Sequence, residues 1–106
     1  MPEEQRKATR KALKVKAMLA MGGKEPIVVH TVDIGATGVS IAVPHPLSAG
    51  QLGQVAFSMF FGGKVHHINA LTKVVDCVFS GNEFKVGFVF TQLDVAAAAS
   101  IAQFFL

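Results

Sequence analysis

Apolar and polar residues alternate along most of the chain with a period of two. The alternation begins at Ala12 and continues to Met21, and a turn rich in glycine and proline follows over 22–26. Further runs of β-branched and aromatic residues, separated by turns, cover 27–32, 39–43, 54–61, 64–79 and 84–90. A period of two places successive side chains on opposite faces of a strand. The pattern therefore predicts six antiparallel strands joined by short turns.

The run over 64–79 is too long for one flat strand, so we expect a bend or a β-bulge within it. Its last part, 74–79, predicts a buried strand in which Cys77, the only cysteine, is a small core residue. A single cysteine leaves no internal disulfide and no multi-cysteine metal site. His66 and His67 would point to opposite faces of their strand and could not easily share a metal ion. The sequence therefore predicts no metal or other cofactor.

The period changes after Leu93. Asp94 is a suitable N-cap for a helix, and the segment that follows is rich in alanine, a strong helix former. Apolar residues recur there at helical spacing, at Val95, Ala98, Ala102 and Phe105. We expect a helix that covers one opening of a barrel. The fold predicted for the chain is therefore all-β, a six-stranded antiparallel β-barrel with a C-terminal α-helix.

Length and composition favour a single folded domain. The chain has 106 residues, of which 51% are hydrophobic and 16% charged, and this composition argues against disorder. The longest apolar stretch, over 95–106, is shorter than the roughly 20 residues that a membrane span needs. The charged N-terminus lacks the apolar region of a signal peptide. We expect a soluble, cytoplasmic protein.

Positive charge is concentrated near the N-terminus. The net charge is +3, and seven of the ten lysines and arginines lie within the first 24 residues: Arg6, Lys7, Arg10, Lys11, Lys14, Lys16 and Lys24. This distribution predicts a basic N-terminal arm over 1–11, followed by the barrel domain over 12–106. Such a segment attracts an anionic nucleotide, a nucleic acid or a membrane surface, but a solvated tail that only aids solubility is an equal alternative.

Two short motifs have residue types suited to binding a nucleotide. Arg6 and Arg10 form an Arg-x-x-x-Arg, and guanidinium groups pair with phosphates and with the O6 and N7 edge of guanine. The segment 33–38 reads Asp-Ile-Gly-Ala-Thr-Gly between two predicted strands. The carboxylate of Asp33 suits the donors of a guanine edge, and glycines allow a close approach to the main chain. An ordinary glycine-rich hairpin, with Asp33 bonded to its own backbone, is the alternative.

The two motifs together resemble the signature of the PilZ domain family, Arg-x-x-x-Arg followed by Asp/Asn-x-Ser-x-x-Gly. The Val-Gly-Phe-Val-Phe strand at 86–90, placed before a C-terminal helix, also resembles that family. The resemblance implies a bacterial, non-catalytic receptor for the second messenger cyclic di-GMP. It also implies a conformational change that is relayed to an unidentified partner protein in motility, pilus, biofilm or polysaccharide control.

The resemblance assigns roles to individual residues. Arg6 and Arg10 would grip phosphates and guanine edges, Asp33 would accept from a guanine, and Gly38 would provide the turn geometry. Further contacts are implied for three polar residues of the arm, Gln5, Lys7 and Lys11. Gly35 departs from the family pattern, which has serine there. A hydrogen bond to a charged group is worth roughly 1.5–3 kcal/mol, so its loss would weaken ligand binding about tenfold or more.

Two other functions remain open on this sequence. The departure at Gly35 fits an adaptor of the same fold that binds only proteins. The basic arm fits a small nucleic-acid-binding barrel, although few basic residues lie on the strands and the chain has no Trp or Tyr for stacking. We expect a monomer or weak homodimer, without DNA binding or membrane insertion.

Overall fold

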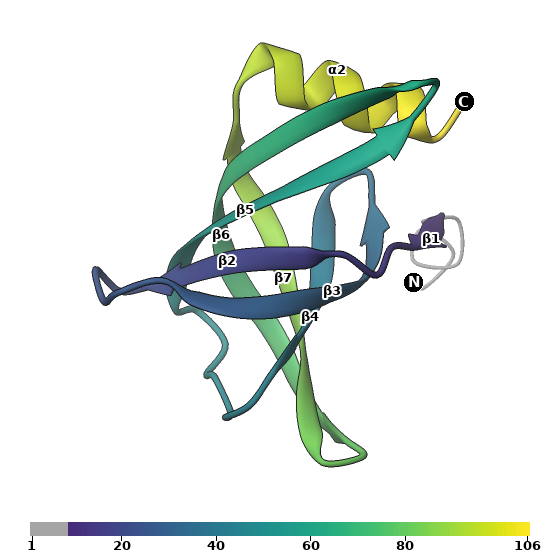
Figure 1. Cartoon of the computed structure of the whole chain (residues 1–106). Helices are drawn as coiled ribbons and strands as arrows, with labels where there is room; N and C mark the ends of the chain where they lie inside the picture. Colours follow the sequence, from purple (N-terminus) through teal and green to yellow (C-terminus); the bar gives the residue numbers. More distant parts are fainter. Residues whose placement is uncertain (1–8) are drawn as a thin grey trace, which may run out of the picture.

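A computed structural model of the chain describes residues 9–106, and within them seven strands and one helix. The elements are β1 (Arg10–Ala12), β2 (Lys16–Met21), β3 (Ile27–Gly35), β4 (Gly38–Val43), β5 (Leu52–Phe61), β6 (Lys64–Ser80), β7 (Glu83–Leu93) and α2 (Val95–Phe104). Six strands pair antiparallel in the order β3-β2-β5-β6-β7-β4, and β4 pairs back with β3, which closes the barrel (Figure 1). The predicted six-stranded barrel with a C-terminal helix is confirmed.

The first predicted strand is interrupted in the structure. Residues 13–15 leave the regular pattern and separate β1 from β2, although both strands pair with β3. Thr31 of β3, which is buried, fills the interruption with its side chain: its hydroxyl accepts from the Val15 amide at 2.9 Å and donates to the Leu13 carbonyl. Arg10 and Lys11, assigned to the arm from the sequence, therefore lie in a strand held against β3.

A β-bulge in β3 decides where the Asp33 side chain lies. Thr31 pairs with Ile41 of β4, but the next pair is Asp33 with Ser40, so the register shifts between them. Without this extra residue, the alternation that buries Val29 and Thr31 would carry Asp33 into the core. With the bulge, Ile34 is fully buried and Asp33 faces the outside of the barrel.

The turn after β3 is shorter than predicted. The sequence suggested a loop over 33–38, whereas β3 continues to Gly35 and β4 starts at Gly38, which leaves only Ala36 and Thr37 between the strands. Asp33 and Ile34 remain in the sheet because they pair with β1 on one side and with β4 on the other.

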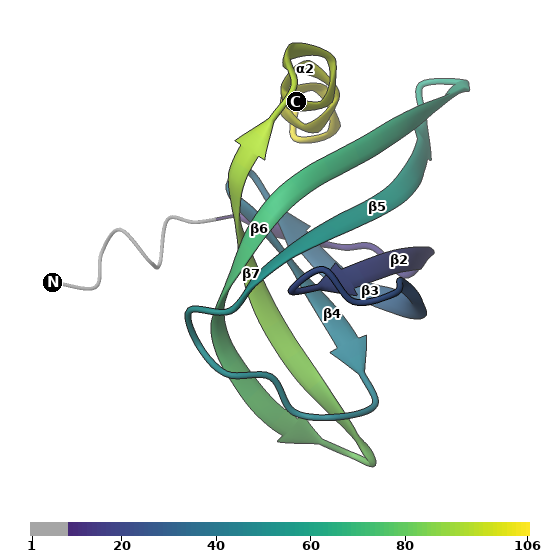
Figure 2. The same ribbon diagram turned by 90° about the vertical axis from the view of Figure 1, so that its left-hand side faces the viewer.

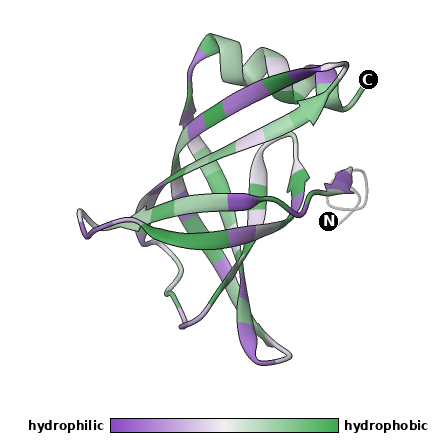
Figure 3. Ribbon diagram, in the orientation of Figure 1, coloured by the Kyte–Doolittle hydropathy of each residue, from purple (hydrophilic) through white to green (hydrophobic). Residues whose placement is uncertain are grey.

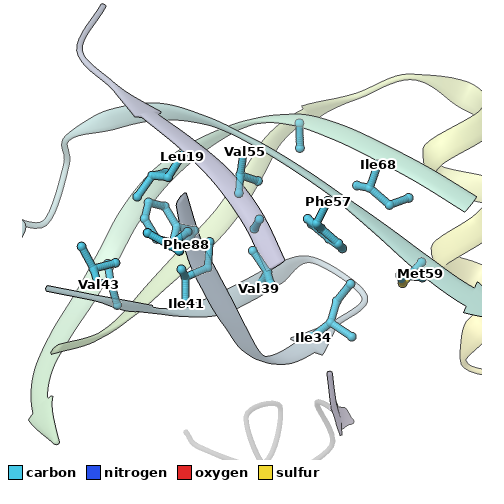
Figure 4. Close-up of a cluster of buried hydrophobic side chains, with 14 of the residues drawn as sticks. Leu19, Ile34, Val39, Ile41, Val43, Val55, Phe57, Met59, Ile68 and Phe88 are labelled. Atoms are coloured by element: carbon cyan, nitrogen blue, oxygen red, sulfur yellow. The ribbon is translucent and has the colours of Figure 1, made fainter. Parts of the chain in front are cut away.

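The barrel interior is filled by apolar side chains from all six strands. Figure 4 shows this cluster, in which the labelled residues point toward one another from different strands. Its largest fully buried members include Leu19, Ile34, Ile41, Met59 and Ile68. Figure 3 shows that the strands are largely hydrophobic, whereas β1 is hydrophilic. The alternating pattern predicted from the sequence is thus the pattern of inward and outward side chains.

The β6–β7 hairpin extends beyond the barrel, and Figures 1 and 2 show its tip projecting at the end opposite α2. The register of β6 with β7 shifts twice. Between Leu71 and Thr72 the extra residue is Thr91 of β7, and between Val74 and Asp76 it is Val75 of β6, which confirms the bulge expected in β6. The prediction that 74–79 is a buried strand is wrong for most of the segment, because the projecting part of the hairpin extends past the other strands. Cys77 is partly buried at the margin of the core, while Val75, Val78 and Phe79 are exposed.

Helix α2 begins as predicted but packs with a different face. The Asp94 side chain accepts from the Ala97 amide at 2.7 Å and so caps the N-terminus. The buried residues of α2 are Ala97 and Ile101. Of the predicted face, Val95, Ala98 and Ala102 are exposed, and only Phe105, just after the helix, is partly buried against the core. The bulky Ile101 and Phe104 determine the packing, and Phe104 lies against Phe61 with 5.2 Å between ring centroids. No helix within residues 9–106 is long and apolar enough to cross a membrane.

Candidate functional site

Arg10 and Asp33 form an ion pair on the outside of the barrel. Pairing of β1 with β3 sets Ala12 opposite Asp33 and Arg10 opposite Gly35, so the Arg10 side chain reaches back along β3 to the carboxylate. Its Nε donates to Asp33 Oδ1 at 2.7 Å, and its Nη2 lies 2.7 Å from the same oxygen. The structure therefore brings together the second arginine of one predicted motif and the aspartate of the other.

Two residues from neighbouring strands complete the cluster. Arg10 Nη2 also donates to the Ser40 hydroxyl at 3.3 Å, and Ser40 lies beneath it on β4, directly opposite Asp33. Lys85 of β7 places its Nζ 3.6 Å from Asp33 Oδ2. Arg10 and Lys85 are 40% and 47% exposed, respectively, so both cations are accessible to a ligand, while Asp33 is largely covered.

The neighbours of Asp33 keep its carboxyl group ionised. Burial by itself would raise the pKa of Asp33, but hydrogen bonds from Arg10 and Ser40 and the charges of Arg10 and Lys85 outweigh burial and lower the pKa below 3.8. An ionised carboxylate has only acceptor oxygens. At neutral pH the site therefore offers one shielded acceptor group between two cations.

A cavity of about 310 Å³ opens beside this cluster. Arg10, Asp33, Ser40 and Lys85 line one part of it. The projecting β6–β7 hairpin supplies the other part with Val75, Asp76, Val78, Gly87 and Phe88. Val75 and Val78 are more than half exposed, so they form an apolar wall that a flat ring could contact. The cavity thus combines charged and apolar surfaces, as small-molecule sites do.

Asp76 is a second carboxylate at the cavity. Its Oδ1 accepts from the Gly87 amide at 3.1 Å. A Cβ atom on residue 87 would lie 2.5 Å from that oxygen, so glycine is needed there for the carboxylate to reach the backbone. Ser40 is paired with Gly87, and Gly87 with Asp76, so the polar residues form one row across β3, β4, β7 and β6.

The motif glycines act through close approach rather than through turn geometry. Neither Gly35 nor Gly38 has a positive φ, unlike the glycines of the hairpin turns. A Cβ atom on Gly38 would lie only 2.2 Å from the carbonyl oxygen of Phe88 on β7. Gly38 is therefore needed where β4 and β7 pack, and the turn role expected for it is not the one observed.

Lys11 points away from the Arg10–Asp33 pair. Its Nζ donates to the Phe104 carbonyl at the end of α2 at 2.6 Å, and it lies 4.9 Å from the Phe104 ring centroid and 5.5 Å from that of Phe105. Adjacent residues of β1 thus contact two different parts of the molecule. Lys11 thus links β1 to the helix, and the ligand contact expected for it stays a prediction.

The predicted contacts at Gln5, Arg6 and Lys7 lie outside the described residues. Sequence reasoning also missed Ser40, Asp76 and Lys85. The alternation of the strands places Ser40 and Lys85 on the outer face, because their neighbours Val39, Ile41 and Val86 are buried. That signal identifies the face but not their closeness to Asp33, which depends on how distant strands pair.

The fold is similar to that of several solved structures. The inhibitor of motility (MotI/DgrA) from Bacillus subtilis has a TM-score of 0.80 at 14% identity over 93% of this chain, which spans about half, 48%, of that protein. The PilZ domain with c-di-GMP of YcgR from Escherichia coli has a TM-score of 0.67 at 13% identity, covering 94% of this chain and 88% of that one. The PilZ domain of CeSA from a cellulose-synthesizing bacterium has a TM-score of 0.59 at 15% identity, covering 92% and 94%.

The sequence itself also identifies the family. No curated protein sequence matches the chain significantly. The family model described as "PilZ domain", however, matches residues 4–106, which is nearly the whole chain and includes both motifs. The barrel and its C-terminal helix agree with this match, because the solved PilZ domains share the fold. The chain therefore belongs to the PilZ domain family.

Proposed function

We propose that this protein is a receptor for cyclic di-GMP and that the ligand binds at the cavity beside Arg10 and Asp33. The observation that carries the proposal is the ion pair itself: the two motifs, 23 residues apart in sequence, meet at one solvent-accessible cavity. Membership of the PilZ family and the c-di-GMP bound to the PilZ domain of YcgR support it. Arg6 of the first motif would contribute from the arm.

Ligand binding would exchange the partners of the ion pair. A phosphate of the ligand takes the place of Asp33 at the Arg10 guanidinium, and the N–H donors of a guanine take the place of Arg10 at the Asp33 carboxylate. Arg10 would keep an anionic partner and Asp33 would keep hydrogen-bond donors, so opening the pair leaves neither group unpaired in a partly buried position. The low pKa of Asp33 supports this exchange, because the carboxylate stays ionised and can accept.

The composition of the cavity matches that of the ligand. Cyclic di-GMP contains two guanines and two phosphates. The cavity has two carboxylates, Asp33 and Asp76, and two cations, Arg10 and Lys85. Carboxylates suit the donor edge of guanine, and the cations suit phosphate. The exposed Val75 and Val78 would contact a base face. The site could take one ligand molecule or part of a stacked pair.

Isothermal titration of the purified full chain with cyclic di-GMP tests this proposal. Arg10→Ala and Asp33→Ala should each lower the affinity by about tenfold or more, since each removes a charge-assisted hydrogen bond. Arg6→Ala tests the arm in the same way. Lys73→Ala is the matched control, because Lys73 is an exposed cation on β6 that does not line the cavity. The proposal would be refuted if no heat of binding appears at high micromolar cyclic di-GMP. It would also be refuted if Lys73→Ala lowers the affinity as much as Arg10→Ala and Asp33→Ala do.

A second candidate is an adaptor of the same fold that binds no nucleotide. Two observations favour it: glycine replaces the family serine at Gly35, and Arg10 already has a partner in Asp33. In that case Arg10→Ala would leave partner binding unchanged, and cyclic di-GMP would not alter it. A partner pull-down with and without the nucleotide separates the two functions.

The relay of a ligand signal would pass through β1. Arg10 contacts the ligand cavity while Lys11, the next residue, bonds to the end of α2. A shift of Arg10 toward a phosphate would therefore pull on the Lys11 contact with Phe104. This change at α2 would be available to an unidentified partner protein and requires no catalytic activity.

A further inference from the structure

A β-bulge lies next to each of the two carboxylates of the cavity. In β3 the register with β4 shifts between Thr31 and Asp33. In β6 the register with β7 shifts in the same way between Val74 and Asp76. Thr31 and Val74 are buried, so regular alternation would carry both aspartates into the core. Each bulge instead turns its aspartate outward, where both line one cavity, and β-bulges often re-aim a side chain beside a functional site.

The Asp76 carboxylate is held in place but keeps acceptor capacity for a ligand. Its Oδ1 is fixed by the Gly87 amide across the hairpin, whereas its Oδ2 has no hydrogen-bond or ion-pair partner within residues 9–106. Each carboxylate oxygen has two lone pairs, so both oxygens can accept from a ligand at the same time. Val75 and Val78, on either side of Asp76 in β6, are 52% and 57% exposed. A base whose edge meets the carboxylate would therefore also find an apolar surface for its ring.

Asp33 and Asp76 stand at opposite ends of the polar row, so they suit two different bases. The row crosses β3, β4, β7 and β6 through directly paired residues. Three strand spacings of about 4.8 Å put the two Cα atoms at most roughly 14 Å apart. The N1 and N2 donors of guanine lie on a single edge of the base, so one guanine serves one carboxylate. Cyclic di-GMP has a second guanine, and Asp76 is the acceptor left for it.

We infer that Asp76 binds the second guanine of cyclic di-GMP and makes the site select a ligand with two guanines over a ligand with one. This inference rests on the proposed function. Adenine carries an acceptor, N1, where guanine carries an N–H donor, so a carboxylate facing adenine would set two acceptors against each other. A bidentate contact of this kind discriminates between bases by roughly tenfold or more. Asp33 selects the first base in the same way, and Asp76 adds the selection of the second.

Isothermal titration of the full chain with cyclic di-GMP, cyclic GMP–AMP and cyclic di-AMP tests the inference. The affinity of the natural chain should fall by roughly tenfold or more each time an adenine replaces a guanine. Asp76→Asn keeps the size of the side chain and offers one donor and one acceptor, which fit either base. This variant should therefore bind cyclic di-GMP and cyclic GMP–AMP about equally, because the single guanine of the mixed nucleotide can turn to Asp33. Cyclic di-AMP should remain the weakest ligand.

Two further variants separate the position of the carboxylate from its charge. Gly87→Ala keeps the charge but puts a Cβ atom 2.5 Å from Asp76 Oδ1, so it should displace the carboxylate and lose the preference for the second guanine. Glu83→Gln is the matched control, because it removes an exposed acid of the same hairpin that does not line the cavity. It should keep the ranking of the natural chain. Thermal melting checks that each variant is folded.

The outcomes distinguish this inference from the proposed function. If the natural chain binds cyclic di-GMP but binds cyclic GMP–AMP equally well, Asp76 selects no base and the inference is wrong. The same conclusion follows if Asp76→Asn keeps the natural ranking, or if Glu83→Gln loses it as well. In these cases the ligand site beside Arg10 and Asp33 stands. If none of the three nucleotides binds to the natural chain, both the proposed function and the inference fail.

Discussion

A Cβ atom on Gly35 would lie 2.9 Å from Nη1 of Arg10. The absence of a side chain at residue 35 therefore lets the Arg10 guanidinium lie against the backbone of β3 while it pairs with Asp33. The obstacle to a larger residue is the tip of a flexible side chain rather than backbone. A serine at this position, which the family pattern has, would displace Arg10 without breaking the barrel.

Gly35→Ser should strengthen the binding of cyclic di-GMP. The hydroxyl adds a hydrogen bond to a charged ligand, worth roughly 1.5–3 kcal/mol, which corresponds to about tenfold or more in affinity. The displaced Arg10 is also released toward a phosphate. The unfolding free energy should fall by roughly 0.2–1 kcal/mol at most, which is the contribution expected of the partly exposed Arg10–Asp33 pair that the serine disturbs. Isothermal titration and chemical denaturation measure the two effects.

Gly35→Ala is the control that separates the hydroxyl from the displacement of Arg10. The alanine should displace Arg10 in the same way but add no hydrogen bond to the ligand. Its gain in cyclic di-GMP affinity should therefore be smaller than that of Gly35→Ser. If both variants bind more weakly than the natural chain, the position of Arg10 against Gly35 is itself required for binding.

Asp33→Asn should reduce the acid sensitivity of the fold. Because the folded pKa of Asp33 lies below its ordinary value of 3.8, its ion pairs stabilise the barrel at neutral pH, and this stability is lost as the pH falls through the folded pKa. The partly exposed pair should contribute roughly 0.2–1 kcal/mol. The variant should therefore be less stable at pH 7 and lose less on acidification, as measured by denaturation across the acid range.

Glu25→Gln is the matched control for Asp33→Asn. Glu25 is an exposed acid in the β2–β3 turn and forms no salt bridge within the described residues. Its replacement should leave the acid dependence of stability nearly unchanged. A similar change in both variants would show that the acid sensitivity comes from the overall charge and not from the Arg10–Asp33–Lys85 cluster.

The barrel could be predicted from the sequence because its signals are local. Alternation over 16–21, the glycine pairs at the hairpins and the Asp94 cap each depend on a few neighbouring residues. The helix face could not be predicted in this way, because an alanine-rich segment has little periodicity of its own, and Ile101 and Phe104 decide the packing through contact with the barrel.

The candidate site could be predicted only in part, for a related reason. Arg10 and Asp33 belong to a motif that is visible in the chain, whereas Lys85 reaches Asp33 through two strand pairings. The bulge that turns Asp33 outward depends on the pairing of β3 with β4 and leaves no mark in the sequence. The exposure of Val78 likewise depends on how far the β6–β7 hairpin extends past the other strands.

Gly38→Ala should destabilise the fold. The added Cβ would lie 2.2 Å from the Phe88 carbonyl oxygen, and this obstacle is backbone within the β4–β7 pairing. Overpacking of this kind costs about 1–3 kcal/mol and occasionally more. Thr37→Ala, one residue earlier in the exposed turn, should have little effect. Denaturation curves measure the unfolding free energies of the two variants. Equal values would contradict the close approach of Gly38 to the Phe88 carbonyl.

The contact of Lys11 with α2 should depend on the ligand. Lys11 Nζ bonds to the Phe104 carbonyl, and both Phe104 and Phe105 lie within cation–π distance. Lys11→Ala should therefore speed amide hydrogen exchange in the last turn of α2 in the free protein, whereas Lys14→Ala, an exposed lysine of the same segment, should not. If β1 relays the signal, cyclic di-GMP should produce the same change in the natural chain and add little in Lys11→Ala. Unchanged exchange in α2 on saturation with the ligand would contradict this relay while leaving ligand binding at Arg10 intact.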